Sequence, residues 1–241
     1  MKSLYPIALL LYLLPSIACF GQDLYREALP RKHTVSFYLG SGFMYADNGG
    51  SPRTFDLRFQ PMMAFSYGKQ LTPMVKLTAT LGFQGVRSNE GVFSESIYRQ
   101  WAEEGQAYKF TGNATMFDIV PVAYLYPFEN HMFRKRINLY GGFGLGVMSV
   151  SRTQYVFNET GDISQNASNT APYIPVRIGL VVPFNGIFDL GIQGSLMYTF
   201  SDELDGNVGY NNRNDHLAQI QLTATHYIST TPFWKKWFIR L

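Results

Sequence analysis

The residues best able to do chemistry gather in an acidic stretch near the end of the chain. His216 directly follows Asp215, and the stretch before them adds three further carboxylates: Asp202, Glu203 and Asp205. Carboxylate oxygens are preferred ligands of hard divalent cations. The stretch could therefore bind a divalent cation, or bridge lipopolysaccharide through one. Acidic loops are more commonly just solvated, so we assign no metal, cofactor or catalytic residue to it.

The other three histidines lie far apart in the chain. His33 precedes the first predicted strand, His131 lies in a predicted turn, and His226 lies on the apolar face of the last predicted strand. A serine or histidine mechanism needs a base within hydrogen-bond reach of a nucleophile. The sequence has neither a glycine-rich phosphate loop nor a Cys-x-x-Cys pair. We expect no enzyme, and a lipid-modifying enzyme is the last alternative.

Long segments of alternating apolar and polar residues must position these groups. In residues 55–68, FDLRFQPMMAFSYG, every second residue from Phe55 to Tyr67 is apolar, and those between are mostly polar, charged or small. This period predicts a strand with two unlike faces. Soluble strands average about five or six residues, whereas a bilayer-crossing strand needs about 9–11. The aromatic residues at both ends suit two membrane interfaces.

Eight segments share this pattern. They are residues 34–45, 55–68, 74–86, 115–127, 137–149, 173–183, 187–200 and 217–228. An even number of antiparallel strands closes into a barrel, and lipid offers no hydrogen-bond partner to a free strand edge. The predicted fold is all-β, an eight-stranded antiparallel transmembrane β-barrel of the outer-membrane type. The alternative is a soluble β-sandwich or a lipocalin-like barrel, whose apolar faces would point inward.

The connections between these segments alternate in length. Residues 69–73, 128–136 and 184–186 are short, and residues 46–54, 87–114, 152–172 and 201–216 are mostly longer. Outer-membrane barrels have short periplasmic turns and longer extracellular loops. We therefore expect the bacterial outer membrane as the location, with periplasmic termini and extracellular loops.

The two ends of the chain differ from the barrel in composition. Residues 1–21 have a basic start and an apolar run, which predicts a signal peptide. Cys19, the single cysteine, leaves with it, unless the protein is a lipoprotein anchored there. We expect a periplasmic lead at 22–33, the barrel at 34–228 and an aromatic-basic tail at 229–241. The formal net charge of +3, which falls by one when Lys2 is removed, argues against a nucleic-acid partner.

Charged residues on the polar faces would lie inside the barrel. Counted from the strand ends, they form two layers: Arg58, Asp118 and Arg177 in one, and Lys76 and Asp189 in the other. Buried charges need partners, so we predict paired charges within each layer. Such pairs plug the lumen, and the alternative is a proton path or a small solute pore.

One motif carries a family resemblance. The segment MYTFSDELDG (197–206) follows PYIPVRIGL and FDLGIQGSL, and YLYPF is followed by INLYGGFGLGV. These stretches resemble the PorG-like outer-membrane barrels of Bacteroidetes. The matching positions are Thr199, Phe200, Ser201, Asp202, Leu204 and Asp205. Ser201 replaces the usual Thr, Glu203 replaces Tyr, and Gly206 replaces Asp.

The resemblance implies a component of the type IX secretion machinery. In that family the barrel tethers a periplasmic ring of lipoprotein and partner subunits to the outer membrane, so the partners implied are outer-membrane lipids and that ring. The working surfaces would be residues 22–32, 129–136 and 231–241. The partner-binding candidates are Arg134, Lys135, Arg136, Trp234, Lys235, Lys236 and Trp237. The tail could instead be an interfacial anchor.

The alternative function is that of a small surface barrel. Its long extracellular loops, above all residues 87–114, would bind a ligand or a host.

Overall fold

The computed structural model describes residues 30–48, 57–88, 94–159, 161–208 and 214–229. The chain divides into two compact units, Met1–Pro30 and Arg31–Leu241. The predicted signal peptide, most of the lead and nearly all of the C-terminal tail lie outside the described residues, as does Phe55. None of the helices in the described part is both long and apolar enough to cross a membrane.

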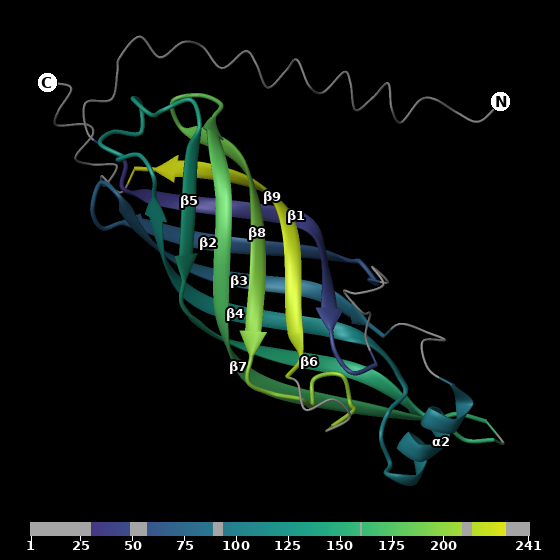
Figure 1. Cartoon of the computed structure of the whole chain (residues 1–241). Helices are drawn as coiled ribbons and strands as arrows, with labels where there is room; N and C mark the ends of the chain where they lie inside the picture. Colours follow the sequence, from purple (N-terminus) through teal and green to yellow (C-terminus); the bar gives the residue numbers. More distant parts are fainter. Residues whose placement is uncertain (1–29, 49–56, 89–93, 160, 209–213, 230–241) are drawn as a thin grey trace, which may run out of the picture. The chain divides into compact units, whose positions relative to one another are not determined.

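The second unit is an antiparallel sheet that closes on itself (Figure 1). Its elements are β1 (His33–Tyr45), β2 (Gln60–Gln70), β3 (Val75–Arg87), α2 (Glu95–Glu103), β4 (Lys109–Tyr124), β5 (Asn138–Phe143), β6 (Leu145–Val156), β7 (Ile163–Pro183), β8 (Phe188–Thr199) and β9 (His216–Ile228). Consecutive strands pair around the ring, and β1 pairs with β9 to complete it. The sheet is thus a barrel whose described strands all have two neighbours.

The strands β5 and β6 share one position in the ring. Both pair with β4 on one side and β7 on the other, without a change of register. The ladder is interrupted at Gly144, whose N–H donates to Pro175 O at 3.1 Å. Pro175 itself has no N–H to return. The nine strands of the described residues therefore occupy eight positions, and the fifth predicted segment, 137–149, corresponds to this interrupted strand.

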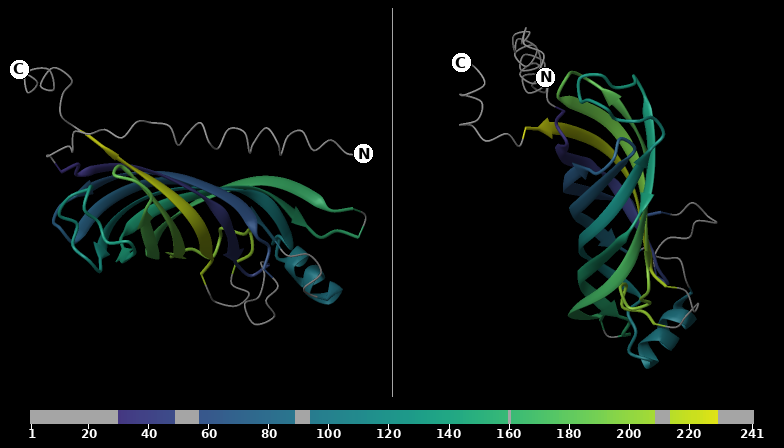
Figure 2. Two further views of the ribbon diagram at one scale, coloured as in Figure 1. Left: turned by 90° about the horizontal axis from the view of Figure 1, so that it is seen from above. Right: turned by 90° about the vertical axis from the view of Figure 1, so that its left-hand side faces the viewer.

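The barrel has two unlike ends. The turn end carries residues 71–74, 125–137 and 184–187, together with the start of β1 and the end of β9. Among the described residues, the loop end carries 46–48, 57–59, 88, 94–108, 157–159, 161–162, 200–208 and 214–215, with α2 among them (Figures 1 and 2). The expected loops 87–114 and 152–172 are shorter than predicted, because β4 begins at Lys109 and β6 pairs with β7 as far as Val156 opposite Ile163.

The missed strand residues are explained by a switch of polarity along each strand. Towards the turn end of β4, Phe117 and Ile119 are exposed and Asp118 is buried. Towards the loop end the same face stays buried but the polarity is reversed, since the buried residue is Phe110 and the exposed one is Thr111. A strand needs no apolar outer face where that face meets water, so a search for long apolar faces does not find this part of the strand.

The interior is divided in the same way. Apolar side chains fill it towards the loop end: Met44, Ala46, Val86, Phe110, Ala114, Met116, Met148, Val150, Ala171, Tyr173, Met197, Leu204 and Leu217. Towards the turn end it is largely polar, with buried threonine, serine, glutamine and charged side chains. The loop end is therefore packed like a soluble barrel, and the rest has an apolar outer surface and a polar interior.

The second predicted strand, 55–68, begins later than expected. β2 starts at Gln60, and Arg58 lies exposed before it, so Arg58 is not a charge of the lumen as predicted. Within β2 the predicted faces hold, because Met63, Phe65 and Tyr67 are exposed while Met62 and Ala64 are buried.

Replacing Gly144 by alanine tests the close approach of neighbouring strands. A Cβ atom there would lie 2.1 Å from Ile119 O, and main-chain atoms cannot move aside. We expect Gly144→Ala to lower the free energy of unfolding by about 1–3 kcal/mol, as overpacking does. Gly194→Ala is the matched control, since its Cβ would meet Ile178 Cγ2 only at 3.9 Å. Urea unfolding measures both, and equal costs would contradict this strand geometry.

Candidate functional site

The turn 125–137 folds back into the mouth of the barrel at the turn end. Arg134 Nη2 lies 2.6 Å from Asp189 Oδ1, and the two side chains are 8% and 2% exposed. The same guanidinium lies over the Tyr227 ring at 4.6 Å, and Tyr227 OH donates to Asp189 Oδ2 at 2.7 Å. Phe128 stacks on the Tyr227 ring, with 5.4 Å between the ring centroids. We call these four residues the turn-end cap.

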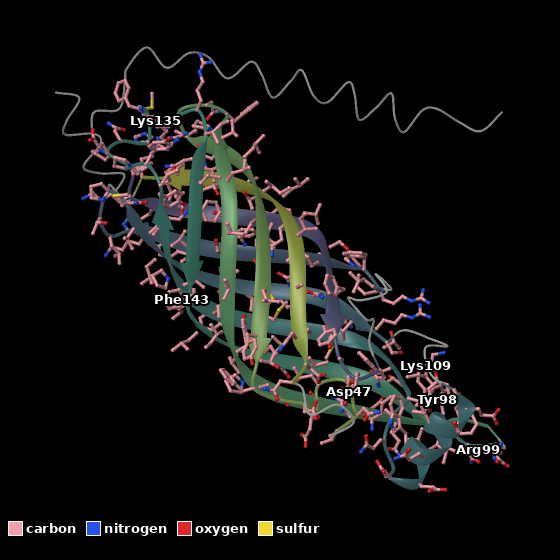
Figure 3. All side chains as sticks on the ribbon, viewed as in Figure 1. Asp47, Tyr98, Arg99, Lys109, Lys135 and Phe143 are labelled. Atoms are coloured by element: carbon pink, nitrogen blue, oxygen red, sulfur yellow. The ribbon has the colours of Figure 1, made fainter. Side chains whose placement is uncertain are left out.

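The turn-end cap corrects two expectations. Arg134, predicted at a partner surface, is buried as the partner of a lumen carboxylate. Lys76, predicted to pair within the layer of Asp189, instead holds its ammonium over the Tyr124 ring at 5.3 Å. Lys135 and Arg136 are exposed at the turn end, where Figure 3 labels Lys135. A partner role for them stays a prediction, and Trp234, Lys235, Lys236 and Trp237 lie outside the described residues.

An ion pair crosses the middle of the lumen. Arg177 Nη2 lies 2.6 Å from Asp118 Oδ2, and the two side chains are 5% and 3% exposed. Arg177 also donates to Thr80 Oγ1 at 2.9 Å, and Tyr173 OH donates to Asp118 Oδ2 at 2.8 Å. These hydrogen bonds satisfy much of what a buried pair requires. Asp118 and Arg177 belong to the layer in which the sequence placed them.

Further hydrogen bonds between buried side chains, most of them amides, fill the lumen beside this ion pair. Tyr140 OH donates to Gln193 Oε1, Gln193 Nε2 donates to Gln221 Oε1, and Gln219 Nε2 donates to Gln84 Oε1. Two cavities inside the barrel measure about 10 Å³ each, room for roughly one water molecule apiece. The lumen is thus filled by side chains rather than open.

The motif singled out in the sequence folds over the loop end. Leu204 and Asp205 are buried, and their backbone N–H groups both donate to Asp215 Oδ2, at 2.8 and 3.2 Å. Thr199 is also buried and donates through Oγ1 to Asp215 O and to Ser201 O. Asp202 is half-buried. This arrangement is the loop-end cap: residues 199–207 closed by Asp215.

Gly206 lies in the motif at a position where the backbone favours glycine. Its φ of 89° lies in the left-handed region that favours glycine. A Cβ atom there would meet Gln154 Oε1 at 2.6 Å. The local backbone and packing therefore both favour glycine.

Two asparagines that the sequence did not single out complete the loop-end cap. Asn48 N donates to Asp205 Oδ2 at 3.2 Å, and Asn207 N donates to Asp205 Oδ1 at 2.8 Å. Asn48 Nδ2 and Asn207 Nδ2 both donate to Ala107 O, at 3.1 and 3.3 Å. Asn48 and Asp205 are 157 positions apart in the chain, so no local pattern could have joined them.

Burial dominates the electrostatics of the loop-end cap. Removal from water raises the pKa of Asp205 and, more strongly, that of Asp215, whose pKa the Asp205 carboxylate raises further. Arg152 lies nearby, but its side-chain hydrogen bonds to described residues go to the neutral acceptors Gln154 Oε1 and Leu204 O. The Arg152 charge therefore lowers the pKa of Asp205 from a distance, without a direct hydrogen bond to either carboxylate of the cap.

The four histidines make structural contacts. His33 Nδ1 bonds Tyr67 OH, His131 Nδ1 accepts from Arg31 N at 3.1 Å, and the His226 ring packs on Phe188. His216 packs on Tyr198 with ring centroids 4.4 Å apart. Among the described residues, no group of three His, Cys, Asp or Glu side chains is arranged to hold a metal ion.

Removing one charge of the lumen pair tests its burial. Asp118→Asn leaves Arg177 buried without a counter-charge, which should cost about 3–5 kcal/mol of unfolding free energy, while the double change Asp118→Leu with Arg177→Met should recover most of it. The control is Arg99→Met, because Arg99 pairs with Glu95 on α2 at 56% and 65% exposure. That change should cost at most about 1 kcal/mol. Similar losses for both single changes in urea unfolding would contradict a buried pair.

Comparisons with solved structures find outer-membrane proteins of low sequence identity, each with a TM-score below 0.5. Ail, the attachment invasion locus protein of Yersinia pestis, is 11% identical, with a TM-score of 0.45 over 82% of this chain and 99% of that chain. Neisserial surface protein A is 10% identical, with a TM-score of 0.48 over 81% and 97%. A major outer membrane protein from Thermus thermophilus is 13% identical, with a TM-score of 0.48 over 80% and 98%. No curated protein sequence matches the chain.

A family profile matches more than half of the sequence. It covers residues 89–232, which include every element from α2 to β9 and the whole motif of the loop-end cap. Since this is more than half of the chain, the protein belongs to the family described as Domain of unknown function (DUF6089).

Proposed function

We propose that the chain spans the bacterial outer membrane and serves there as a closed scaffold. The observation that carries this proposal is the exposed apolar surface around the barrel. Large apolar side chains of every strand position are exposed, as with Phe143 at 70%, Ile178 at 71% and Leu222 at 65% (Figure 3). Soluble monomers rarely expose a contiguous apolar surface of this extent. A hydrocarbon environment removes that cost, and the closed ring leaves no strand edge to be satisfied in it.

The same proposal sets the orientation of the barrel in the membrane. Short turns and both barrel termini belong to the periplasmic side of such proteins, and the longer loops belong outside. The turn end would then face the periplasm, and α2 with the loop-end cap would face the exterior.

Arginine scanning of the outer face tests the membrane assignment. Leu81 is exposed on β3, with Phe117 of β4 opposite it. Leu81→Arg should cost about 2–4 kcal/mol of stability in a bilayer, since arginine at the midplane is that unfavourable on a lipid-facing position. Thr111→Arg is the matched control on the same outer face near the loop end, where the cost should be about 0–1 kcal/mol. Equal stability of the two variants in lipid vesicles would refute the assignment of the apolar belt to lipid.

A scaffold role is supported by what fills the barrel. The lumen holds the Asp118–Arg177 pair and the amide network, the turn-end cap fills one mouth, and the loop-end cap folds over the other. Such an interior offers neither a route for solutes nor a substrate pocket. What remains for interaction is the rim, and at the turn end Lys135 and Arg136 are exposed there. Through its resemblance to PorG-like barrels, we infer that this rim tethers a periplasmic lipoprotein ring of type IX secretion.

Charge reversal at the rim tests the tether. The tagged full-length protein is extracted from native outer membranes, and periplasmic lipoproteins that co-purify are quantified. Lys135→Glu with Arg136→Glu should reduce their recovery about ten-fold or more, which corresponds to about 1.4 kcal/mol of binding. Lys135→Arg with Arg136→Lys keeps the charge and should retain recovery. Unchanged recovery in the reversed variant, or no periplasmic protein with the unaltered chain, would contradict the tether.

A second function, binding through the exterior face, is favoured by a groove near the loop end. It measures about 920 Å³, and its lining includes exposed apolar residues such as Leu39 and Phe83 beside hydroxyl and amide side chains such as Thr111 and Asn113. Tyr98 of α2 packs against Tyr108, with ring centroids 4.8 Å apart. Recovery of partners that cross-link only to this end would favour the surface-binding function over the tether.

A further inference from the structure

The loop-end cap contains buried oxygen atoms without hydrogen-bond partners. They are Asn48 Oδ1, Asn207 Oδ1 and Asp215 Oδ1. Asn48 is 1% exposed, and Asn207 and Asp215 are fully buried. A buried polar atom without a partner costs roughly 1–3 kcal/mol. Three such atoms in one cluster call for a ligand that the protein atoms alone do not supply.

These atoms belong to side chains that converge on one place. Asn48 and Asn207 both donate through Nδ2 to Ala107 O, and their backbone N–H groups donate to the two oxygens of Asp205. Asp205 N in turn donates to Asp215 Oδ2. Hydrogen bonds thus tie the four residues into one cluster, and three of the four carry a buried oxygen without a hydrogen-bond partner.

The unpartnered atoms are all hydrogen-bond acceptors. Each is an oxygen acceptor, two from amides and one from a carboxylate, so a ligand must offer positive charge or donors. Burial disfavours the charged form of both carboxylates, and the Arg152 charge lowers the pKa of Asp205 only in part, because the hydrogen bonds of Arg152 go to neutral acceptors among the described residues. A divalent cation would satisfy the free oxygens and compensate the carboxylate charges together.

We propose that the loop-end cap binds one calcium ion, through Asp205, Asp215 and the amide oxygens of Asn48 and Asn207. Calcium takes carboxylate, Asn and main-chain carbonyl oxygens in flexible geometry, whereas zinc sites favour Cys and His, and magnesium keeps most of its water. The site needs only two carboxylates, which agrees with the lack of a three-residue His, Cys, Asp or Glu group in the described part of the chain.

The ion would join loops that are distant in sequence. Asn48 follows β1, Ala107 precedes β4, Asp205 and Asn207 follow β8, and Asp215 precedes β9. Calcium would link two of these loops directly, and the third through the hydrogen bonds of Asn48 and Asn207 to Ala107 O. The proposal does not depend on the tether, because the tether concerns the opposite end of the barrel.

Titration calorimetry on the full-length protein, refolded in detergent and stripped with EDTA, tests the site with calcium chloride as the probe. We expect about one calcium ion per chain, at least about ten-fold weaker binding of magnesium, and a rise in Tm of about 5 °C or more at saturating calcium. No binding heat together with no change in Tm would overturn the proposal.

Variants then locate the ion. Asp215→Asn and Asn207→Ala should each weaken calcium binding about ten-fold or more, as loss of a ligand does. Glu203→Gln is the matched control in the same loop, because Glu203 is exposed and hydrogen-bonds Asn169, and its affinity should stay within about two-fold of the unaltered chain. Asn48→Ala, which removes no charge, replaces Asp215→Asn should the latter fail to fold. Unchanged affinity in Asn207→Ala and Asn48→Ala would overturn the proposal.

Discussion

Every strand of this protein depends on finding main-chain partners on both sides within a single ring. The β1–β9 pairing closes that ring, and β5 and β6 keep it continuous past Gly144, where Pro175 cannot donate. Once the backbone hydrogen bonds are made in this way, the polarity of the outward side chains can match the surroundings at each height of the barrel. The outer face is apolar at Phe117 and polar at Thr111 of the same strand, with Asp118 and Phe110 buried beneath them in turn.

The part of the fold that lies within the apolar belt could be read from the sequence. There, period two separates two faces, and the faces predicted for β1 and β2 agree with the exposed Phe37, Leu39 and Phe65. The pattern fails in residues 109–114, 152–156 and 163–172, which are strand residues with a polar outer face. Those residues form strands because a neighbour extends the ladder, which is a tertiary cause that no local alternation carries.

Some interior contacts could be predicted from the sequence and others could not. Asp118 and Arg177 could be matched because both lie on inward positions of strands at a similar height. The partner of Asp189 could not, because Arg134 reaches it from a turn that folds back into the barrel. The loop-end cap was equally out of reach, since the acidic motif marks only one of the loops that meet there, and Asn48 joins it from another.

The most direct test of the account is the depth at which the outer face of β4 leaves the lipid. Single cysteines are placed at Thr111, Asn113, Phe117 and Ile119, all exposed on that face, in a chain whose one native cysteine lies in the predicted signal peptide. A water-soluble maleimide is then applied to intact outer membranes. The account predicts labelling at positions 111 and 113 and protection at 117 and 119. Labelling at all four positions would contradict a membrane-spanning barrel.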